Sequence, residues 1–256
     1  MKNKTKKAKH FGLIGRNINY SFSKKYFSEK FEEQGLEQYS YNNFDFQSIE
    51  EFPTVIQNDP TLRGLNVTIP YKEAIIPYLD KVSKNAKKIG AVNTIKVTKK
   101  GTLVGYNTDF HGFRKSLKPL LKKYHNRALI LGTGGASKAV AYALKKLKIE
   151  YDFVSRNPSE YEFSYDSINS EIFDEYQIII NCTPVGTFPN TEECPPLPYE
   201  LFTTKHIAYD LIYNPEETSF LKQAKAHGAQ IKNGYDMLIF QAEKAWSIWN
   251  SKIPKP

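Results

Sequence analysis

The stretch that decides the fold is Arg127–Lys138, which reads Arg-Ala-Leu-Ile-Leu-Gly-Thr-Gly-Gly-Ala-Ser-Lys. Its apolar part, Ala128–Leu131, predicts a buried strand, and the helix-forming segment Ala136–Leu147 follows the glycines at once. A glycine turn at the start of a helix offers backbone N–H groups and the positive end of the helix dipole to an anion. Gly132 and Gly134 match the first two glycines of the dinucleotide-binding fingerprint. The stretch therefore predicts a dinucleotide site, and the alternative is a strand–helix turn without a ligand.

The residues after the next strand indicate which dinucleotide binds. Tyr151–Val154 predicts that strand, and Ser155, Arg156 and Asn157 follow it. An acidic residue at this place would accept a hydrogen bond from the ribose 2′-hydroxyl of NAD, whereas a guanidinium suits the 2′-phosphate of NADP. Ser155 and Asn157 can donate further hydrogen bonds. We therefore predict NADP as the cofactor, and the alternative is that Arg156 is a solvated surface charge.

Composition places the chain among globular proteins of one or two domains. The 256 residues are 40% hydrophobic and 25% charged, and no apolar run approaches the length of a membrane span. Cys182 and Cys194 have a spacing that suggests neither a metal site nor a disulfide framework. The net charge is +9, but the basic residues form a run only at Lys2–Lys9, so we expect residues 1–9 to be a basic tail. We predict cytoplasmic residence with no metal, membrane or nucleic-acid partner.

The hydrophobic pattern predicts an α/β chain in which strands and helices alternate. The expected strands are His10–Ile14, Tyr39–Phe44, Arg63–Thr68, Val92–Val97, Leu103–Tyr106, Gln177–Asn181, Ile207–Asp210 and Gln230–Lys232. The expected helices are Ser23–Gln34, Ile49–Ile56, one that begins at Pro70, one that begins near Asp109, Ser219–His227 and Tyr235–Asn250.

Polar side chains gather at the ends of the expected strands. Asn66, Lys72, Asn93 and Asp109 all lie at such ends, where open α/β sheets bind their ligands. Taken singly, Lys72 reads as a solvated lysine and Asp109 as an acidic residue in the first turn of a helix. Together they supply the donors and acceptors that a polyhydroxylated small molecule needs. Ser21 and Ser23 stand at a helix start, with Ser23 expected as the N-cap, and predict a small anion site.

With these motifs in place, the chain resembles the shikimate dehydrogenase family from about residue 10 to 249. The motifs that carry the resemblance are Ser21-Phe22-Ser23, Asn66–Lys72, Gly90–Thr94, Gly105–Asp109, the glycine loop, Asn181–Gly186 and Gly234–Gln241. The resemblance implies a substrate-binding α/β domain of residues 10–112, completed by 234–256 with the C-terminal helix, and a Rossmann-type NADP-binding domain of residues 113–233. It also implies the reversible NADP-linked reduction of 3-dehydroshikimate to shikimate, on the shikimate pathway to chorismate and the aromatic amino acids.

The resemblance also implies roles for individual residues. Lys72 and Asp109 would form the catalytic pair, and whether Lys72 is the true base or a polarising donor stays open. The substrate would be bound by Ser21, Ser23, Asn66, Thr68, Asn93, Tyr213 and Gln241. The cofactor would be bound by Gly132, Thr133, Gly134, Gly135, Ala136, Ser155, Arg156, Asn157, Thr183, Gly186, Leu211, Gly234 and Met237. A monomer and a homodimer both fit.

Three other functions share part of this pattern. A quinate/shikimate dehydrogenase with relaxed substrate or cofactor choice would show nearly every motif. A methylenetetrahydrofolate dehydrogenase would explain the glycine loop but not the Ser-x-Ser and Asn-Thr-Asp motifs. A non-catalytic NADP-binding sensor would bind nucleotide without turnover, and the presence of both Lys72 and Asp109 disfavours it.

Overall fold

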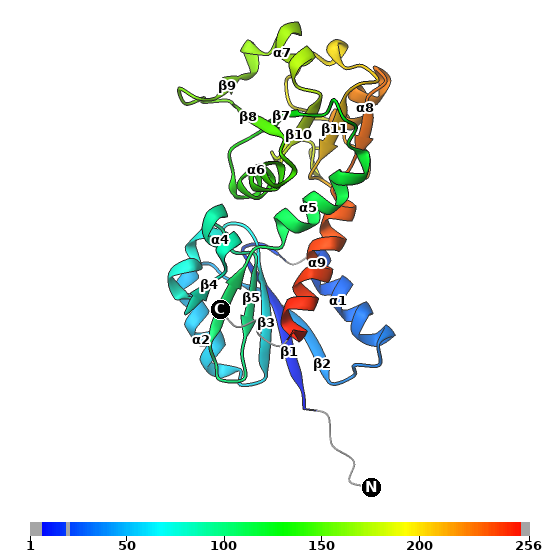
Figure 1. The fold of residues 1–256 in the computed structure, drawn as a ribbon. Helices are drawn as coiled ribbons and strands as arrows, with labels where there is room; N and C mark the ends of the chain where they lie inside the picture. The colour runs from blue at the N-terminus through cyan, green and yellow to red at the C-terminus, as the bar shows by residue number, and fades with distance from the viewer. Residues whose placement is uncertain (1–6, 19–20, 252–256) are drawn as a thin grey trace. The chain divides into compact units, whose positions relative to one another are not determined.

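The computed structural model describes residues 7–18 and 21–251, which divide into two compact α/β units (Figure 1). The first unit holds the described residues up to Thr108 and from Ala242 onward, and the second is Asp109–Gln241. The sequence places these boundaries after residue 112 and before residue 234. Residues 1–6 of the expected basic tail lie outside the described residues, and Lys9 already belongs to the first strand. The prediction of two α/β sheets is confirmed.

The first unit is built around a mixed sheet with the strand order β2-β1-β3-β5-β6-β4. Its elements are β1 (Lys9–Gly15), α1 (Phe22–Glu33), β2 (Tyr39–Asp45), α2 (Phe52–Asn58), β3 (Leu62–Val67), α3 (Tyr71–Ala74), β4 (Lys81–Val82), α4 (Lys84–Ile89), β5 (Thr94–Val97), β6 (Leu103–Tyr106) and the end of α9 (Tyr235–Asn250). Because β5 runs antiparallel to both β3 and β6, the end of β3, the start of β5 and the end of β6 meet at one edge. That edge is where Asn66, Asn93 and Thr108 converge.

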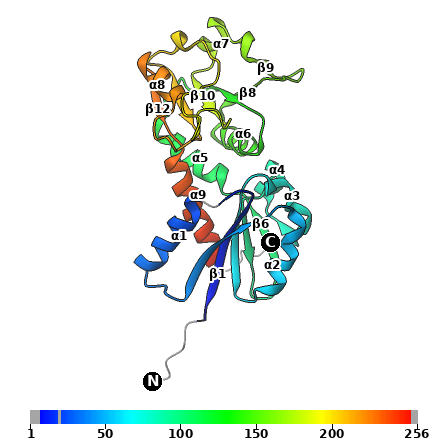
Figure 2. The same cartoon turned by 180° about the vertical axis from the view of Figure 1, so that it is seen from behind.

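Helices cover both faces of the first sheet (Figures 1 and 2). Helix α2 packs Phe52 into the core of one face, whereas α1 and α9 pack Phe27 and Trp249 into the core of the other. Trp249 is fastened by a 2.9 Å hydrogen bond from its indole Nε1 to the Ile95 carbonyl. Its ring lies so close to Gly64 that a Cβ there would come within 2.3 Å of Nε1, so only glycine fits. The end of α9 is thereby fixed to β3 and β5.

The second unit is built around a parallel sheet with the strand order β12-β11-β10-β7-β8-β9. Its elements are α5 (Asp109–Leu117), β7 (Arg127–Leu131), α6 (Gly135–Leu147), β8 (Glu150–Ser155), β9 (Phe163–Ser164), α7 (Ser170–Glu175), β10 (Ile178–Asn181), β11 (Ile207–Asp210), α8 (Ser219–Ala226), β12 (Gln230–Lys232) and the start of α9. Successive residues of β7 point to opposite faces of the sheet, so Leu129 packs into the core on one face and Ile130 into the core on the other.

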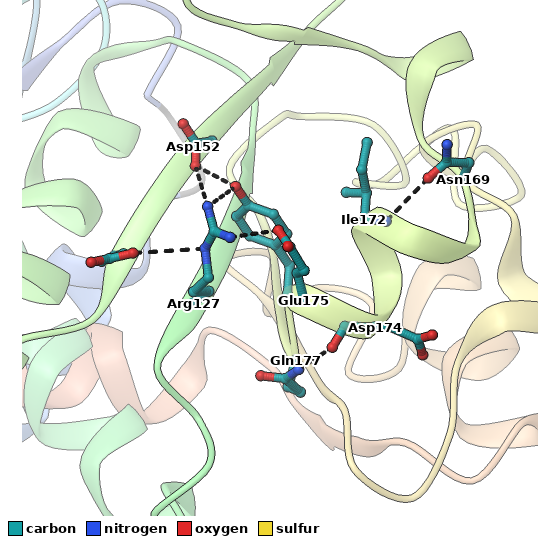
Figure 3. Close-up of polar contacts among 9 residues, drawn as sticks. Arg127, Asp152, Asn169, Ile172, Asp174, Glu175 and Gln177 are labelled. Carbon is teal, nitrogen blue, oxygen red and sulfur yellow. Dashed lines mark hydrogen bonds and ion pairs between the residues drawn. The ribbon is translucent and has the colours of Figure 1, made fainter.

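The starts of the strands in this second sheet are tied together by a polar cluster around Arg127 (Figure 3). The guanidinium of Arg127 contacts Glu175 and donates a 2.7 Å hydrogen bond to the hydroxyl of Tyr176, which itself donates to Asp152 at 2.6 Å. Burial, and next the hydrogen bond to Asp152, raise the pKa of Tyr176, so this hydroxyl stays protonated as a donor. The cluster joins the amino-terminal parts of β7 and β8 to the carboxyl end of α7. The carboxyl ends of the two strands, on the opposite side of the sheet, stay available for ligands.

Two local predictions are wrong in detail. Helix α1 begins at Phe22, so Ser21 and not Ser23 occupies the N-cap position, and Ser23 lies in the first helical turn. Helix α3 begins at Tyr71, because Pro70 itself has the non-helical angles φ −96° and ψ 13°. Elements such as α4 and β9 were not expected, since their short sequences carry no periodic apolar pattern.

Candidate active site

A buried polar network occupies the edge of the first sheet where three strand ends meet. The Asn93 side chain is 3% exposed; its Nδ2 donates to Thr108 Oγ1 at 2.9 Å and its Oδ1 accepts from the Thr108 backbone N–H at 2.6 Å. Asn66 Nδ2 donates to the Asn93 carbonyl at 3.3 Å and to Thr94 Oγ1 at 3.4 Å. These side chains are rigid because burial makes each lost hydrogen bond costly.

The same network fixes the backbone beside both predicted catalytic residues. The Lys72 carbonyl accepts a 2.7 Å hydrogen bond from the N–H of Val92, which directly precedes Asn93. Asp109 follows Thr108 in the chain, and Thr108 is held by Asn93. One pair of neighbouring residues, Val92 and Asn93, therefore holds the Lys72 backbone on one side and the residue before Asp109 on the other.

The two serines at the start of α1 have different surroundings. Ser23 is buried and forms a hydrogen bond with the hydroxyl of Tyr41, which donates to Asn66 Oδ1 at 2.9 Å. Burial raises the pKa of Tyr41 far above its usual range, and the Ser23 bond opposes this only in part. Ser21 Oγ is also buried, but among the described residues it has no hydrogen-bond partner. A buried hydroxyl of this kind can donate a hydrogen bond to an oxygen of a bound anion.

Thr68 lies directly after β3 and packs against the end of β1. Its N–H donates to the Ile14 carbonyl at 2.8 Å, and its carbonyl accepts from Tyr71 at 2.9 Å. A Cβ on Gly15 would come within 2.5 Å of the Thr68 methyl group, so the end of β1 and Thr68 are packed at the closest possible distance. Thr68 thus sits at the same edge as Asn66, as the sequence predicts.

The glycine loop of the second unit joins the end of β7 to the start of α6. Gly132 has φ +91°, a conformation that side chains disfavour, and its N–H donates to the Val154 carbonyl at 2.8 Å. Gly134 is exposed, and a Cβ there would meet nothing within 4 Å, so open space lies beside its backbone. Ser137 fills the third, small position and donates to the Gly134 carbonyl at 2.6 Å. Thr133, Gly135 and Ala136 complete the loop and the first turn of α6.

The residues predicted to discriminate the cofactor follow β8. Ser155 ends the strand, Arg156 and Asn157 are exposed, and the Asn157 N–H donates to Ser155 Oγ at 3.3 Å. Arg156 is close enough to Tyr165 to lower the pKa of its hydroxyl, although burial, the larger effect, raises it. The strand β8 lies next to β7, which leads into the glycine loop. An exposed guanidinium at the end of β8 can therefore pair with a phosphate.

The remaining predicted cofactor residues follow β10 and β11. Thr183 accepts from the Val185 N–H at 3.3 Å, and Gly186 has φ +93°. Gly234 lies so close to Leu211 that a Cβ would come within 2.0 Å of its carbonyl oxygen. These loops are therefore shaped by close backbone approach at glycine and by hydroxyl-to-backbone bonds.

Three predicted residues lie around the start of α9 or the end of β11. Met237 is buried in the core beside α5, where Gly112 allows the two helices to approach. Gln241 is buried, and its Nε2 donates to the Leu238 carbonyl at 3.0 Å. Tyr213 is 39% exposed on the loop after β11. Their roles as ligand contacts stay predictions.

Over residues 7–18 and 21–251, no group of three or more His, Cys, Asp or Glu side chains is arranged to hold a metal ion. In that same part of the chain, no helix has the length and apolar character to cross a membrane.

The fold and the site define a class: an α/β oxidoreductase with a Rossmann-type NADP-binding unit and a separate mixed-sheet unit for the substrate. Comparison with known proteins agrees, since residues 13–95 match the family model described as the shikimate dehydrogenase substrate binding domain. The shikimate dehydrogenase (NADP(+)) of Clostridium botulinum is 40% identical over 248 residues, covering 93% of this chain and 95% of that protein. The chain belongs to the shikimate dehydrogenase family.

Solved structures support the same assignment. Shikimate 5-dehydrogenase from Thermus thermophilus, in complex with NADP(H) and shikimate, aligns at 34% identity and a TM-score of 0.83, covering 96% of this chain and 95% of that one. Quinate dehydrogenase from Corynebacterium glutamicum, in complex with NAD, aligns at 26% identity and a TM-score of 0.85, covering 98% and 96%. The predicted family, NADP as cofactor and shikimate dehydrogenase activity in the shikimate pathway are confirmed.

Sequence reasoning missed two residues that shape these sites. Tyr41 bridges Ser23 and Asn66, yet it appears in the sequence only as one aromatic residue of a strand. Asp210 is a buried carboxylate at the end of β11, and its only mark in the sequence is that an acidic residue follows the strand-forming residues Ile207–Tyr209.

Proposed function

We propose that this chain interconverts 3-dehydroshikimate and shikimate with NADP(H), and that Lys72 and Asp109 assist the proton transfer. The observation that carries the assignment is the neighbouring pair Val92 and Asn93, because the Val92 N–H holds the Lys72 carbonyl and the Asn93 side chain holds Thr108, the residue before Asp109. The family's activity requires one proton donor next to the reacting oxygen, and this network holds a lysine segment and a carboxylate segment at one sheet edge.

The protein's part in the reaction is to move a proton and to fix geometry, since NADP supplies or accepts the hydride when it is bound. In the reduction, the ketone oxygen of the substrate gains a proton as its carbon gains the hydride. We assign the proton donor to the Lys72 ammonium and the orientation of that ammonium to the Asp109 carboxylate. In the oxidation, the amine takes the proton of the alcohol back. A positioned side chain of this kind contributes a factor of about 10²–10⁴ to the rate.

We assign the substrate carboxylate to the hydroxyls at the start of α1. The buried Ser21 Oγ without a partner among the described residues supports this, because a carboxylate oxygen would accept its proton. Ser23 can contribute through the hydroxyl that contacts Tyr41. Asn66, Thr68, Asn93, Tyr213 and Gln241 are assigned to the substrate hydroxyls and the walls of the site from the family resemblance.

We assign the cofactor to the carboxyl edge of the parallel sheet. The open space beside Gly134 and the exposed N-terminus of α6 fit a pyrophosphate, and the exposed Arg156 fits a 2′-phosphate. Thr183, Gly186, Leu211, Gly234 and Met237 would then border the nicotinamide half. We further propose that the protein acts in the cytoplasm as a monomer or homodimer, with small molecules as its only other partners.

The test is a comparison of Lys72→Ala and Asp109→Asn with the unaltered protein. We expect both variants to lose about 10²–10⁴-fold in turnover with shikimate and NADP, while the Kd for NADP changes little. Lys25→Ala is the matched control, because Lys25 is an exposed lysine of the same unit that pairs only with the nearby Glu29. Near-normal turnover in both Lys72 and Asp109 variants would refute the assignment.

A second candidate is a quinate/shikimate dehydrogenase with relaxed choice of substrate or cofactor. Its support is the alignment over nearly the full length with the quinate dehydrogenase described above, in complex with NAD. Four assays that combine shikimate or quinate with NADP or NAD separate the two functions. We expect the largest kcat/KM for shikimate with NADP, whereas equal values for quinate would favour the second candidate. Nucleotide binding without turnover in all four assays would indicate the sensor.

A further inference from the structure

Asp210 is a buried carboxylate that the proposed proton transfer does not use. It ends β11, it is 0% exposed, and its hydrogen-bond partners belong to the second unit. Its Oδ1 accepts from the Ile212 N–H at 3.0 Å and from Asn181 Nδ2 at 3.1 Å, and its Oδ2 accepts from Thr218 Oγ1 at 2.6 Å. One carboxylate thus joins the ends of β10 and β11 to the N-cap of α8.

The bond from Asn181 extends this control to the loop that follows β10. Asn181 Oδ1 accepts from the Thr183 N–H at 3.0 Å and from Thr183 Oγ1 at 2.6 Å. Thr183 Oγ1 then accepts from the Val185 N–H at 3.3 Å. Because Asp210 orients the amide of Asn181, it decides which way Asn181 Oδ1 faces and so fixes Thr183.

The order of the strands indicates which half of a bound dinucleotide the loops after β10 and β11 would face. In the order β11-β10-β7-β8, the glycine loop follows β7 and Arg156 follows β8. A dinucleotide with its pyrophosphate at the glycine loop and its 2′-phosphate at Arg156 extends its other half across the ends of β10 and β11. That half carries the nicotinamide, so Asp210 lies beneath the loops that would border the ring.

Among the titratable groups that face one another around Asp210, Asp210 itself is the one whose charge changes near neutral pH. The other titratable groups that face it are Cys182, Tyr199 and Tyr209, and burial raises the pKa of each, so all three are neutral near pH 7. Burial also raises the pKa of Asp210, to about 6, although its three hydrogen bonds oppose the shift. The carboxylate is therefore ionised at and above neutral pH and becomes protonated in mild acid.

We propose that Asp210 is a positioning residue that holds a buried negative charge under the nicotinamide half of the site and thereby favours the oxidised, cationic ring over the reduced, neutral ring. The inference rests on the proposed function, because it needs NADP to bind along the glycine loop. Its physical basis is that a charge in a buried setting acts on a nearby cation with little screening.

The test measures the Kd of NADP⁺ and of NADPH, by calorimetry and by the fluorescence of the reduced ring, in Asp210→Asn. The amide can still accept from Ile212 and Asn181, and the Thr218 hydroxyl can turn to accept from it, so the shape is kept while the charge is lost. We expect NADP⁺ to bind about three- to tenfold more weakly and NADPH to change by less than about twofold. Asp152→Asn is the matched control, since Asp152 belongs to the same sheet and its described partners are Tyr176 and Arg127 of the Arg127 cluster.

A second measurement needs no variant. In the unaltered protein, the ratio of the two dissociation constants, Kd(NADPH) over Kd(NADP⁺), should fall as the pH drops through about 6, where Asp210 is protonated. The 2′-phosphate titrates in the same range but belongs to both forms of the cofactor, so its effect cancels in the ratio. A ratio that is constant with pH, or equal weakening of both forms in Asp210→Asn, would overturn the inference. Failure of the unaltered protein to bind either form would instead refute the proposed function.

Discussion

The binding edges of the two sheets are built on opposite plans. In the first unit the edge is made of side chains, Asn66, Asn93 and Thr108, which are buried and hydrogen-bonded to one another. In the second unit the part of the edge that follows β7 is made of backbone: Thr133 and Gly134 are exposed, and open space lies beside Gly134. The first edge is therefore organised before any ligand arrives, whereas the loop after β7 offers exposed backbone that an anion can approach closely.

The difference teaches what each edge is for. Proton transfer needs a fixed geometry, since a small displacement of the reacting groups lowers the rate steeply. A pyrophosphate needs close approach to N–H groups, which only small residues permit. Buried side-chain networks thus fit the chemical step, and exposed glycine backbone fits the binding of the cofactor.

The largest expected effect on cofactor binding comes from placing a side chain on the glycine loop of the second edge. Gly134→Val adds atoms where no neighbour lies within 4 Å and where φ is an ordinary −74°, so the fold should keep its stability. The added atoms would occupy the place of the pyrophosphate, and we expect the Kd for NADP to rise about 100-fold. Calorimetric titration and thermal unfolding measure the two quantities. Gly132→Ala is the contrasting variant, because φ +91° and the Thr183 methyl at 2.9 Å should lower stability as well.

The next effect tests which cofactor the second edge prefers. Arg156→Ala removes an exposed guanidinium that can pair with the 2′-phosphate, and charged hydrogen bonds of this kind contribute about 1.5–3 kcal/mol. We expect the Kd for NADP to rise about 10- to 100-fold while the Kd for NAD is unchanged. An equal loss for both cofactors would show that Arg156 acts on the fold or on a shared part of the dinucleotide.

The third prediction tests whether the first edge is a structural network. Asn93→Ala removes the acceptor of the Thr108 N–H and one hydrogen bond of each of the Thr108 and Thr94 hydroxyls, so we expect a loss of about 1–3 kcal/mol in the free energy of unfolding. Urea unfolding measures it. Asn42→Ala is the control, since Asn42 is exposed on the same sheet, and we expect a change below about 0.5 kcal/mol there. Similar losses in both variants would remove the distinction between the two edges.

The smallest effect concerns the far end of the second sheet. His125 Nδ1 accepts from the Lys122 N–H at 2.9 Å and Nε2 lies 2.9 Å from the Lys205 carbonyl, which together require the neutral ring. Burial, the main cause, lowers the pKa of His125, so the unfolded chain binds a proton more readily than the folded one. His125 therefore contributes stability that is present above about pH 6.5 and is lost as the pH falls through its folded pKa. As the pH is lowered, we expect the Tm of the unaltered protein to decrease more steeply than the Tm of His125→Asn. At neutral pH we expect no difference between the two proteins in the Kd for NADP.

Sequence patterns predict the second edge better than the first for a physical reason. The positive φ of Gly132 demands glycine, so the residue type itself records the backbone. The strands of the parallel sheet are buried on both faces and appear as continuous apolar runs such as Ile178–Asn181. The predicted glycine turn with Gly132 and Gly134 thus lies between a strand and a helix, β7 and α6, as expected.

The first edge depends on pairings that the linear pattern does not encode. Asn93 is predicted to lie at a strand end, but its bonds to Thr108 follow from the antiparallel pairing of β5 with β6. The position of Ser21 as N-cap instead of Ser23 was missed because either serine can begin a helix, and burial of Ser23 against Tyr41 decides it. The buried Asp210 was missed because an acidic residue at a strand end is usually solvated.

The most direct test of the account is a single-turnover measurement with bound NADPH and 3-dehydroshikimate, following the loss of reduced-ring fluorescence in the unaltered protein and in Lys72→Ala. The account predicts rapid hydride transfer in the former, and in the latter a step slowed about 10²–10⁴-fold with an unchanged Kd for NADPH. A hydride-transfer rate that is the same in both proteins would contradict it.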